Sequence, residues 1–551
     1  MASQTEKNTA EEDSDIIEFL NRKLANLTVN SDATEVLGSS DGLPVCEVST
    51  LLPQYSQEIL SALHSNNTVL RLAAVVRLRK YLSLQNVDER VDNVLSLNII
   101  PLLIELLENF DDHLLQYETA WIITNIAAGS TQHTEALVAG GVTQHLIKVL
   151  TVSNNIEVQT QIIWALGNIA GDGAVFRHII LSAGVLDPLL YILSNYEIYD
   201  YMAVRITVWA TANMCRGCRC SDPSWSLITP AFPILANMVQ LNDAEIISDA
   251  CWGMSRILNG THKHREHALV SDNSLCRRLV DLLREDSLTS TVHLPVLRTL
   301  VNIASGAEKQ TQAVIDAGAL TVLTASYLST KNLTLRRDAC LAVSNVAAGT
   351  YCQVNAVLNE PNLMESVVAL LWDSDVKVVK EACWVLSNST SLHDSGHINL
   401  ILQYDILTPL LHHLRNPSTP QEIMNKLIDT LINILSVGDM SSSSPPPPSQ
   451  NAYADQLAAS GLVKALLIAY NHQGLTETIK EKIRSLLERW FYGYLQLIWK
   501  ALMSFEYLKY VLDKHRHLLK YRMSPDNVAI FELILNFKYI LYNKVLIIAL
   551  E

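Results

Sequence analysis

Three short segments place a tryptophan four residues before an asparagine, and together these side chains could grip an extended peptide. The segments are Trp121 to Asn125, Trp164 to Asn168 and Trp209 to Asn213. Residues four apart share one face of a helix, so each helix would present an indole beside a carboxamide. A carboxamide can donate to and accept from a peptide backbone, and an indole attracts a lysine side chain through cation–π contact. The pattern therefore indicates a site for a basic peptide.

The pair recurs along the chain at an almost constant interval. The three tryptophans lie 43 and 45 residues apart. Degenerate forms of the pair, in which one residue is often replaced, follow at steps of 43, 46, 43, 43 and 45 residues. The later pairs are Trp252/Arg256, Arg298/Asn302, Leu341/Asn345, Trp384/Asn388 and Asp429/Asn433. Such a period is typical of stacked helical repeats of the armadillo or HEAT class. A single tryptophan could simply be a core residue, but an asparagine is costly to bury unpaired. We therefore expect an all-α solenoid whose pairs line one concave groove.

Three longer runs resemble the importin-alpha (karyopherin-alpha) family: YETAWIITNIAAGSTQHT, QIIWALGNIAGDG and KEACWVLSNST. The resemblance covers about residues 51–491 and implies a right-handed superhelix of about ten armadillo repeats. It also implies that the chain binds lysine-rich nuclear localisation signals of cargo proteins. The major peptide site would lie on the second to fourth repeats and the minor site on the sixth to eighth.

The resemblance also implies which residues form the two peptide sites. Asp172, Thr134 and the Gly129 carbonyl would hold one deeply bound lysine, although a helix cap is the alternative role for Asp172. The expected major site is Trp121, Asn125, Gly129, Thr134, Gln161, Trp164, Asn168, Asp172, Trp209, Asn213, Arg216 and Asp249. The expected minor site is Arg298, Asn302, Thr311, Asp338, Asn345, Glu381, Trp384 and Asn388. Four positions depart from the family pattern. Leu341 lacks the π face of a tryptophan, and Arg256 would repel a basic peptide. Asp338 and Glu308 each replace the other acid and keep its charge.

Composition changes divide the chain into three parts. Residues 1–50 carry ten acidic and three basic residues and are predicted to be a mostly disordered acidic tail. They lack the basic importin-beta-binding segment with which the family usually begins. Residues 51–491 would form the solenoid, with Gly140-Gly141, Gly184 and Gly318 at turns and a flexible SSSSPPPP loop at 441–448. Residues 492–551 would be an extension, either helices that cap the solenoid or a segment without stable structure.

Charge and motif content argue against several other classes of protein. The net charge of −15 disfavours binding to nucleic acid, and no uncharged apolar run approaches the length of a membrane span. Cys215, Cys218 and Cys220 lack a partner cluster of matching spacing, so we expect no metal and no other cofactor. The histidines at 262, 264 and 267 lack an HExxH pattern. We expect a binding protein and not an enzyme.

The sequence favours a nuclear-import adaptor that works without autoinhibition, as a monomer in cytoplasm and nucleus. One alternative is an armadillo scaffold of the catenin type for acidic or phosphorylated partners, which would need a basic groove. Another is a decoy, a chaperone of basic proteins or a divergent import factor that keeps the peptide groove but not the usual transport cycle. The acidic N-terminal segment leaves recruitment of importin-beta open.

Overall fold

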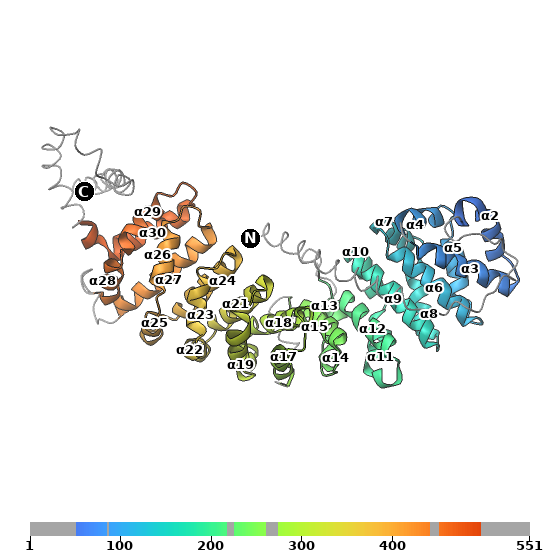
Figure 1. The fold of residues 1–551 in the computed structure, drawn as a ribbon, viewed down its shortest axis with the longest axis horizontal. Helices are drawn as coiled ribbons and strands as arrows, with labels where there is room; N and C mark the ends of the chain where they lie inside the picture. Colours follow the sequence, from blue (N-terminus) through green and yellow to red (C-terminus); the bar gives the residue numbers. More distant parts are fainter. Residues whose placement is uncertain (1–50, 85–86, 218–224, 260–273, 441–450, 497–551) are drawn as a thin grey trace, which may run out of the picture. The chain divides into compact units, whose positions relative to one another are not determined.

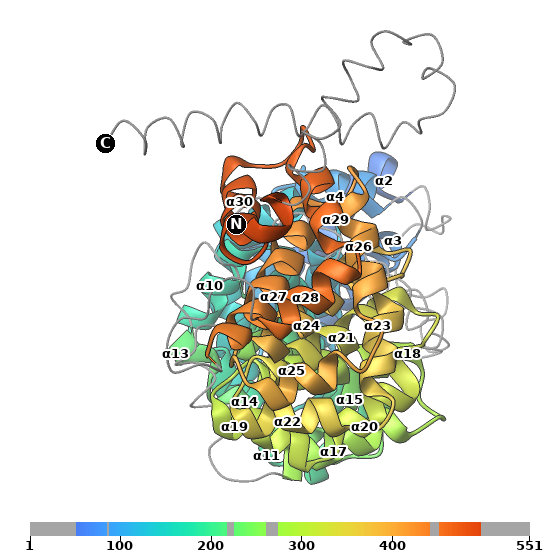
Figure 2. The ribbon, with the colours of Figure 1, turned by 90° about the vertical axis from the view of Figure 1, so that its left-hand side faces the viewer.

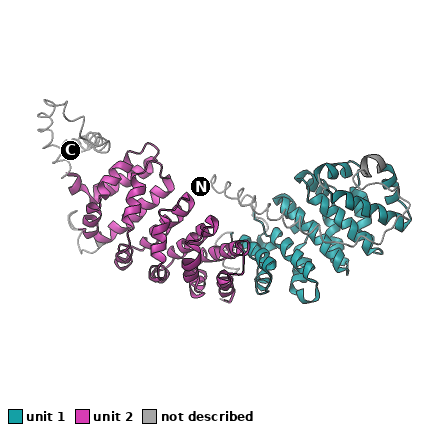
Figure 3. Ribbon diagram, viewed as in Figure 1, with its two compact units in different colours: residues 1–260 teal, residues 261–551 magenta. Residues whose placement is uncertain are grey.

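The computed structural model describes residues 51–84, 87–217, 225–259, 274–440 and 451–496, and all regular structure in these ranges is helical. The chain divides into two compact units, residues 1–260 and 261–551 (Figure 3). The predicted acidic tail, the SSSSPPPP loop and residues 497–551 lie outside the described ranges. The predicted all-α class is confirmed, while the predicted handedness and concave curvature stay predictions.

Unit 1 repeats one order of elements, in which shorter helices precede a longer one (Figure 1). Its long helices are α3 (Thr68–Leu82), α6 (His113–Ala127), α9 (Ile156–Asp172), α12 (Tyr201–Met214) and α15 (Ala244–Leu258). The shorter elements are α2 (Leu51–Leu63), α4 (Val87–Leu95), α5 (Ile100–Leu107), α7 (Thr131–Ala139), α8 (Val142–Val152), α10 (Ala174–Ser182), α11 (Leu186–Ser194), η2 (Tyr196–Ile198), α13 (Trp225–Ile228) and α14 (Ala231–Met238). Each long helix packs against the long helix of the next repeat.

Unit 2 has the same order, and its long helices also lie side by side (Figures 1 and 2). They are α18 (Ser290–Ala304), α21 (Leu333–Ala347), α24 (Val376–Thr390), α27 (Gln421–Met440) and α30 (Glu477–Trp490). The shorter elements are α17 (Ser274–Arg284), α19 (Glu308–Asp316), α20 (Ala319–Val322), the π-helical η3 (Leu323–Tyr327), α22 (Tyr351–Asn359), α23 (Leu363–Leu370), α25 (Ser395–Ile401), α26 (Leu407–Arg415), α28 (Ala452–Ala459) and α29 (Leu462–Tyr470).

The starts of most long helices are encoded by a capping asparagine or aspartate. In each case the side chain accepts a hydrogen bond from a backbone N–H of the first turn, which otherwise lacks a partner. The capping residues are Asn67, Asp112, Asn155, Asp200, Asp243, Asn332 and Asp375. One such cap stabilises a helix by about 1 kcal/mol. The caps recur with the repeat and fix where each long helix begins.

Three glycines provide the turns that the sequence predicts before apolar helices. Gly141, Gly184 and Gly318 have φ angles of 83°, 84° and 78°, in the left-handed region that favours glycine. They immediately precede α8, the Val185 cap of α11 and α20. The predicted turns are therefore confirmed at these three positions, whereas Gly140 ends α7 with an ordinary negative φ.

Within the described part of the chain, no single helix is both long and apolar enough to cross a bilayer. One pair, α10 and α11, meets the length and composition criteria only when taken together, and the pair is bent by 75°.

Candidate peptide-binding ladder

Within each unit the tryptophan–asparagine pairs form a row along the long helices, and we call these rows the ladder. In α6, Ile122, Ile123 and Ile126 are completely buried, whereas Trp121 and Asn125 on the adjoining face are partly exposed. Trp164, Asn168 and Trp209 are partly exposed in the same way on α9 and α12, and only Asn213 is buried. The apolar residues thus pack each helix into the core and leave most of the ladder at the surface.

The ladder asparagines bond neighbouring repeats together in one repeated geometry. In five of them Nδ2 donates to the backbone carbonyl of the residue just before the ladder asparagine of the preceding long helix, whereas Asn125 donates to the Ser83 hydroxyl at 3.2 Å. The bonds are Asn168 to Thr124 at 3.2 Å, Asn213 to Gly167 at 3.3 Å, Asn345 to Val301 at 3.1 Å, Asn388 to Ser344 at 2.9 Å and Asn433 to Ser387 at 3.2 Å. An amide group has two N–H donors and one acceptor oxygen. In the partly exposed Asn168, Asn345 and Asn388, one donor therefore orients the carboxamide, which leaves a donor and the acceptor for a further partner.

Arg256 takes over the asparagine's structural role in α15. Its Nη1 donates to the carbonyl of Ala212 at 2.7 Å, and Ala212 again directly precedes a ladder asparagine. Burial, and secondarily the charge of Arg216, lower the pKa of Arg256 to about 9. The guanidinium is still protonated at neutral pH. Arg256 thus keeps the bond between repeats but adds a positive charge to the ladder.

Asp172 is the exposed acid of the predicted lysine pocket. It lies at the end of α9, where its Oδ1 accepts a hydrogen bond from the Thr131 hydroxyl at 2.9 Å. That bond holds the start of α7 against the end of α9. The Thr134 hydroxyl on α7 is buried, and no hydrogen-bond partner for it is found among the described residues. The structure therefore brings the acid and α7 together, with the Thr134 side chain inside the packing.

Gly129 and His133 form the turn that leads into α7. A Cβ at Gly129 would lie 2.4 Å from Nδ1 of His133, so another residue type there would have to displace the buried His133 ring. His133 is buried, accepts a hydrogen bond from the backbone N–H of Ser130 at 3.0 Å and contacts Asp92 through Nε2 at 2.9 Å. His133 was not predicted as a site residue because its partner Asp92 is remote in sequence.

The other predicted residues of the major site lie within or beside the ladder. Gln161 is buried, and its Nε2 donates to the Thr124 hydroxyl at 2.8 Å, which joins α9 to α6. Asp249 on α15 is also buried. Arg216 donates to the carbonyl of Gly171 at 3.1 Å, beside the end of α9. The bonds of Gln161 and Arg216 thus connect neighbouring repeats beside the ladder.

Gly167 and Arg79, which were not predicted as site residues, contact two of the ladder tryptophans and fix the positions of their rings. Gly167 lies under the indole of Trp209, and a Cβ at this position would come within 2.3 Å of the ring. The guanidinium of Arg79 on α3 lies 4.3 Å from the Trp121 ring centroid and bonds to Glu118 at 2.8 Å. A glycine inside a helix, which is otherwise unfavourable, is the only signal that could have pointed to Gly167.

The predicted minor site combines paired and unpaired acids. Asp338 is buried and accepts hydrogen bonds from Arg298 and Arg337, both at 3.1 Å. Glu381 is partly buried, and within the described ranges no hydrogen bond or ion pair to its carboxyl group is found. Desolvation therefore raises its pKa to about 7, against the opposing effect of Lys380 and Arg337. Only Glu381 of these two acids retains a carboxyl group without a close partner.

The remaining residues of the minor site also lie on or next to the long helices. Asn302, Asn345, Trp384 and Asn388 are partly exposed on α18, α21 and α24. Leu341 occupies the tryptophan position of α21 and is partly exposed as well. The hydroxyl of Thr311 is buried and donates to the carbonyl of Ala304 at 2.9 Å. The exposed side chains therefore form the same kind of row on the long helices of unit 2.

No candidate metal centre emerges from the described part of the chain. No group of three or more His, Cys, Asp and Glu side chains there could hold a metal ion. Burial raises the pKa of the Cys215 thiol to about 12, which keeps it protonated. Cys218, Cys220 and the predicted histidine cluster lie outside the described residues.

Comparisons with known proteins agree with this architecture. The Armadillo/beta-catenin-like repeat family matches residues 88–128 and 130–171. The crystal structure of an engineered protein superimposes with a TM-score of 0.67 at 25% identity, covering 79% of this chain and 98% of that protein. Fold and ladder together define an armadillo-repeat protein, as the sequence predicted.

Comparison with curated relatives narrows this class. Importin subunit alpha-4 of Arabidopsis thaliana is 32% identical over 434 residues, which cover 79% of this chain and 78% of the relative. The chain belongs to the importin-alpha family, whose members are adaptors and not enzymes. Importin subunits alpha-1a and alpha-1b of Oryza sativa subsp. japonica are 34% and 33% identical, and the matches span only 55% and 51% of their lengths.

Proposed function

We propose that this chain is a nuclear-import adaptor that binds lysine-rich nuclear localisation signals along the ladder. One observation carries the proposal: the ladder asparagines are held by bonds between repeats while an exposed acid, Asp172, lies at the end of the same α9 helix that bears Trp164 and Asn168. Family membership supports the general role in nuclear import. The proposed partners are cargo proteins with basic signals. We propose that this chain binds them as a monomer and is present in both cytoplasm and nucleus.

Each part of the ladder has a proposed role in peptide binding. The free N–H and oxygen of Asn125 and Asn168 would bond to the peptide backbone, which requires no particular side chain in the peptide. Trp164 and Trp209 would hold the aliphatic stems of lysines, at roughly 0.5–2 kcal/mol for each well-placed cation, while Trp121, whose ring already carries Arg79, would contribute packing. Asp172 would meet one ammonium group, in a charge-assisted bond worth about 1.5–3 kcal/mol. The remaining predicted residues of the major site would shape and delimit this surface.

The minor site is proposed to bind basic peptides more weakly than the major site. Leu341 gives no cation–π attraction, and the Asp338 carboxylate already accepts bonds from two arginines. Glu381 would be the principal acid for an incoming lysine. Desolvation raises the pKa of Glu381 to about 7, so its carboxyl group is partly protonated at neutral pH, and the positive charge of a bound ammonium would favour the ionised form.

The main alternative is a scaffold for acidic or phosphorylated partners, and charge argues against it. The net charge of −15 opposes such partners, and Asp172 is exposed. Calorimetric titration separates the two functions: we expect a lysine-rich peptide to bind, and a peptide with glutamine in place of every lysine to bind at least about tenfold more weakly. Preferential binding of an acidic or phosphorylated peptide would replace the proposal with the scaffold.

A second alternative is a chaperone or decoy that binds basic peptides but takes no part in transport. A different experiment distinguishes it from an import adaptor. Residues 1–50 are acidic, so docking to importin-beta through a basic segment there is not expected. A pull-down of importin-beta by the full chain, with and without a lysine-rich cargo, tests this point. Capture of importin-beta supports an import adaptor, and the absence of capture under both conditions supports the chaperone or decoy.

A further inference from the structure

One ladder tryptophan in unit 2 already has a cation from the same chain on its ring. The Nζ of Lys426, on α27, lies 3.7 Å from the centroid of the Trp384 ring, on the neighbouring helix α24. The Lys426 side chain is only 17% exposed. An ammonium within about 6 Å of an indole face is attracted by the ring, more strongly when water is excluded. Lys426 thus makes with Trp384 the contact that a lysine of a bound peptide would make.

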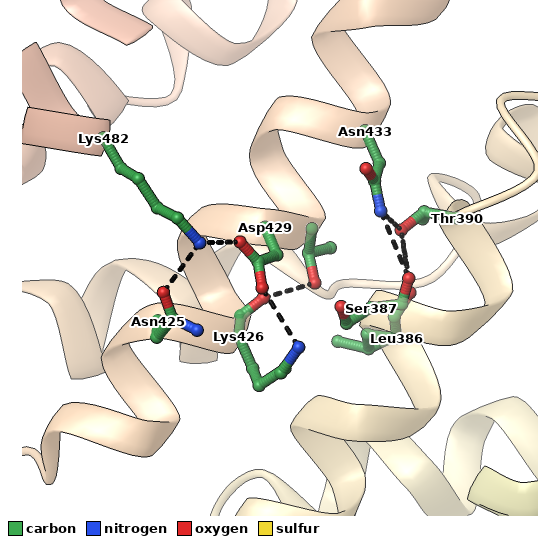
Figure 4. Close-up of polar contacts among 9 residues, drawn as sticks. Leu386, Ser387, Thr390, Asn425, Lys426, Asp429, Asn433 and Lys482 are labelled. Atoms are coloured by element: carbon green, nitrogen blue, oxygen red, sulfur yellow. Dashed lines mark hydrogen bonds and ion pairs between the residues drawn. The ribbon is translucent and has the colours of Figure 1, made fainter. Parts of the chain in front are cut away.

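Lys426 is held in place by a small network of charges. Asp429, one turn further along α27, accepts from Lys426 at 3.1 Å and from Lys482 on α30 at 2.6 Å. Lys482 also donates to Oδ1 of Asn425 at 2.8 Å. Figure 4 shows the Asp429 carboxylate between the two ammonium groups. Two lysines share one carboxylate, so the network has a net positive charge next to the ladder.

In sequence register, this lysine occupies a position at which several other repeats carry acids, while Gln161, Ile206 and Pro295 fill it elsewhere. Lys426 precedes the tryptophan position of α27, which is Asp429, by three residues. The same offset from the tryptophan position places Glu381 on α24, Asp338 on α21 and Asp249 on α15. At α27 the charge at this offset is reversed, and the tryptophan is replaced by the acid that binds the lysine.

An independent pair in unit 1 shows that a ladder indole accepts a cation in this way. Arg79 on α3 lies over Trp121 on the neighbouring α6, at 4.3 Å, and is held by Glu118. In both pairs the cation comes from an adjacent long helix and is fixed by a carboxylate. The contact of Lys426 with Trp384 therefore follows a geometry that the fold uses elsewhere.

We propose that Lys426 is a built-in occupant of the Trp384 slot, and that it selects against a basic peptide side chain at the end of the ladder between α24 and α27. A peptide lysine would have to displace Lys426 and would meet the positive charge of Lys482 as well. This inference rests on the proposed function, since it names a residue that restricts which part of the ladder basic peptides occupy. It predicts that a basic segment bound to unit 2 stops short of α27.

The test compares oligolysine binding to the full chain and to three variants, by calorimetry together with hydrogen exchange of α24 and α27. Lys426→Met keeps the apolar stem but removes the competing cation, and we expect it to raise oligolysine affinity at unit 2 about tenfold and to add protection in α24 and α27. Lys426→Arg should retain the weak binding of the wild type. Lys480→Met is the control: it removes one positive charge from α30 and should change oligolysine affinity by less than about twofold.

The outcomes distinguish this inference from the proposed function. Equal behaviour of Lys426→Met and Lys480→Met would overturn the role of Lys426 even if oligolysine binds unit 1. A gain confined to α24 and α27 in Lys426→Met would support it even if unit 1 binds no oligolysine, a result that would count against the proposed function alone. Circular dichroism of each variant confirms that a lost signal does not come from unfolding.

Discussion

The side-chain amide of Asn388 donates a hydrogen bond to the backbone carbonyl of Ser344, with nitrogen and oxygen 2.9 Å apart. This bond joins α24 to α21, and equivalent bonds recur at Asn168, Asn213, Asn345 and Asn433. The ladder therefore has two tasks. The same carboxamides that are proposed to hold a peptide also connect one repeat to the next, so their loss should affect stability as well as binding.

Asn388→Ala should lower the free energy of unfolding by about 1 kcal/mol, the usual value of one hydrogen bond. Asn359 is exposed and bonds only within α22 in the described structure, so Asn359→Ala should change stability by less than about 0.5 kcal/mol. Urea unfolding followed by circular dichroism compares the two. Equal stability of Asn388→Ala and the wild type would show that the bond between repeats contributes nothing.

Gly167→Ala should destabilise the protein by about 1–3 kcal/mol, because the new Cβ would lie 2.3 Å from the Trp209 ring. Gly171, in the same helix, is a matched control: its added Cβ would come no closer than 3.5 Å to Asn213. Gly171→Ala should therefore show the gain of up to about 1 kcal/mol that alanine gives a helix. The account of Trp209 is wrong if thermal unfolding shows the same change for both variants.

Stability should fall as pH rises from 4.5 to about 7, through the titration of Glu381. Its pKa is raised by desolvation from 4.5 to about 7, so in this window the folded chain binds more protons than the unfolded chain. The contribution of Glu381 to stability is therefore fully present below pH 4.5, is lost between pH 4.5 and about 7, and stays constant above that pH. Glu381→Gln should flatten that part of the pH dependence, and the exposed Glu365→Gln should leave it unchanged. Urea midpoints at several pH values measure the slope, and an unchanged slope in Glu381→Gln would contradict the assignment.

Deletion of residues 1–50 should leave the affinity for a lysine-rich peptide unchanged within about threefold, that is about 0.7 kcal/mol. The segment carries ten acidic and three basic residues, so it gains nothing by binding near Asp172. A segment that competed for the ladder would reduce the apparent affinity by the fraction of ladder it occupied. A tenfold or larger gain in affinity on truncation, measured by calorimetry, would reveal an autoinhibitor within residues 1–50.

The fold was predictable from the sequence because the same local patterns recur in many repeats. The period of 43 to 46 residues, the pairs at Trp164 and Asn168, and the glycines at 141, 184 and 318 all lie in local patterns. A pattern that spans four residues of one helix can be recognised without knowing where the neighbouring helices lie.

The interactions between repeats could not be predicted in the same way. Arg79 and Trp121, like Lys426 and Trp384, are about 40 residues apart and share no motif, so only packing brings them together. Asp338 was expected to attract a basic peptide, and the structure shows that Arg298 and Arg337 already contact its carboxylate. Sequence reasoning identified the charge but not the partners that neutralise it.

The most direct test of the proposed peptide site is calorimetric titration of the wild type and Asp172→Lys with a lysine-rich peptide at fixed salt. Asp187→Lys on α11 makes the same change in net charge away from the ladder and serves as the control. We predict that Asp172→Lys weakens binding by more than about 2 kcal/mol, because a charge-assisted bond is lost and repulsion is added, while Asp187→Lys binds like the wild type. Equal affinity of the wild type and Asp172→Lys would contradict the assignment of this acid, and with it the lysine pocket of the ladder.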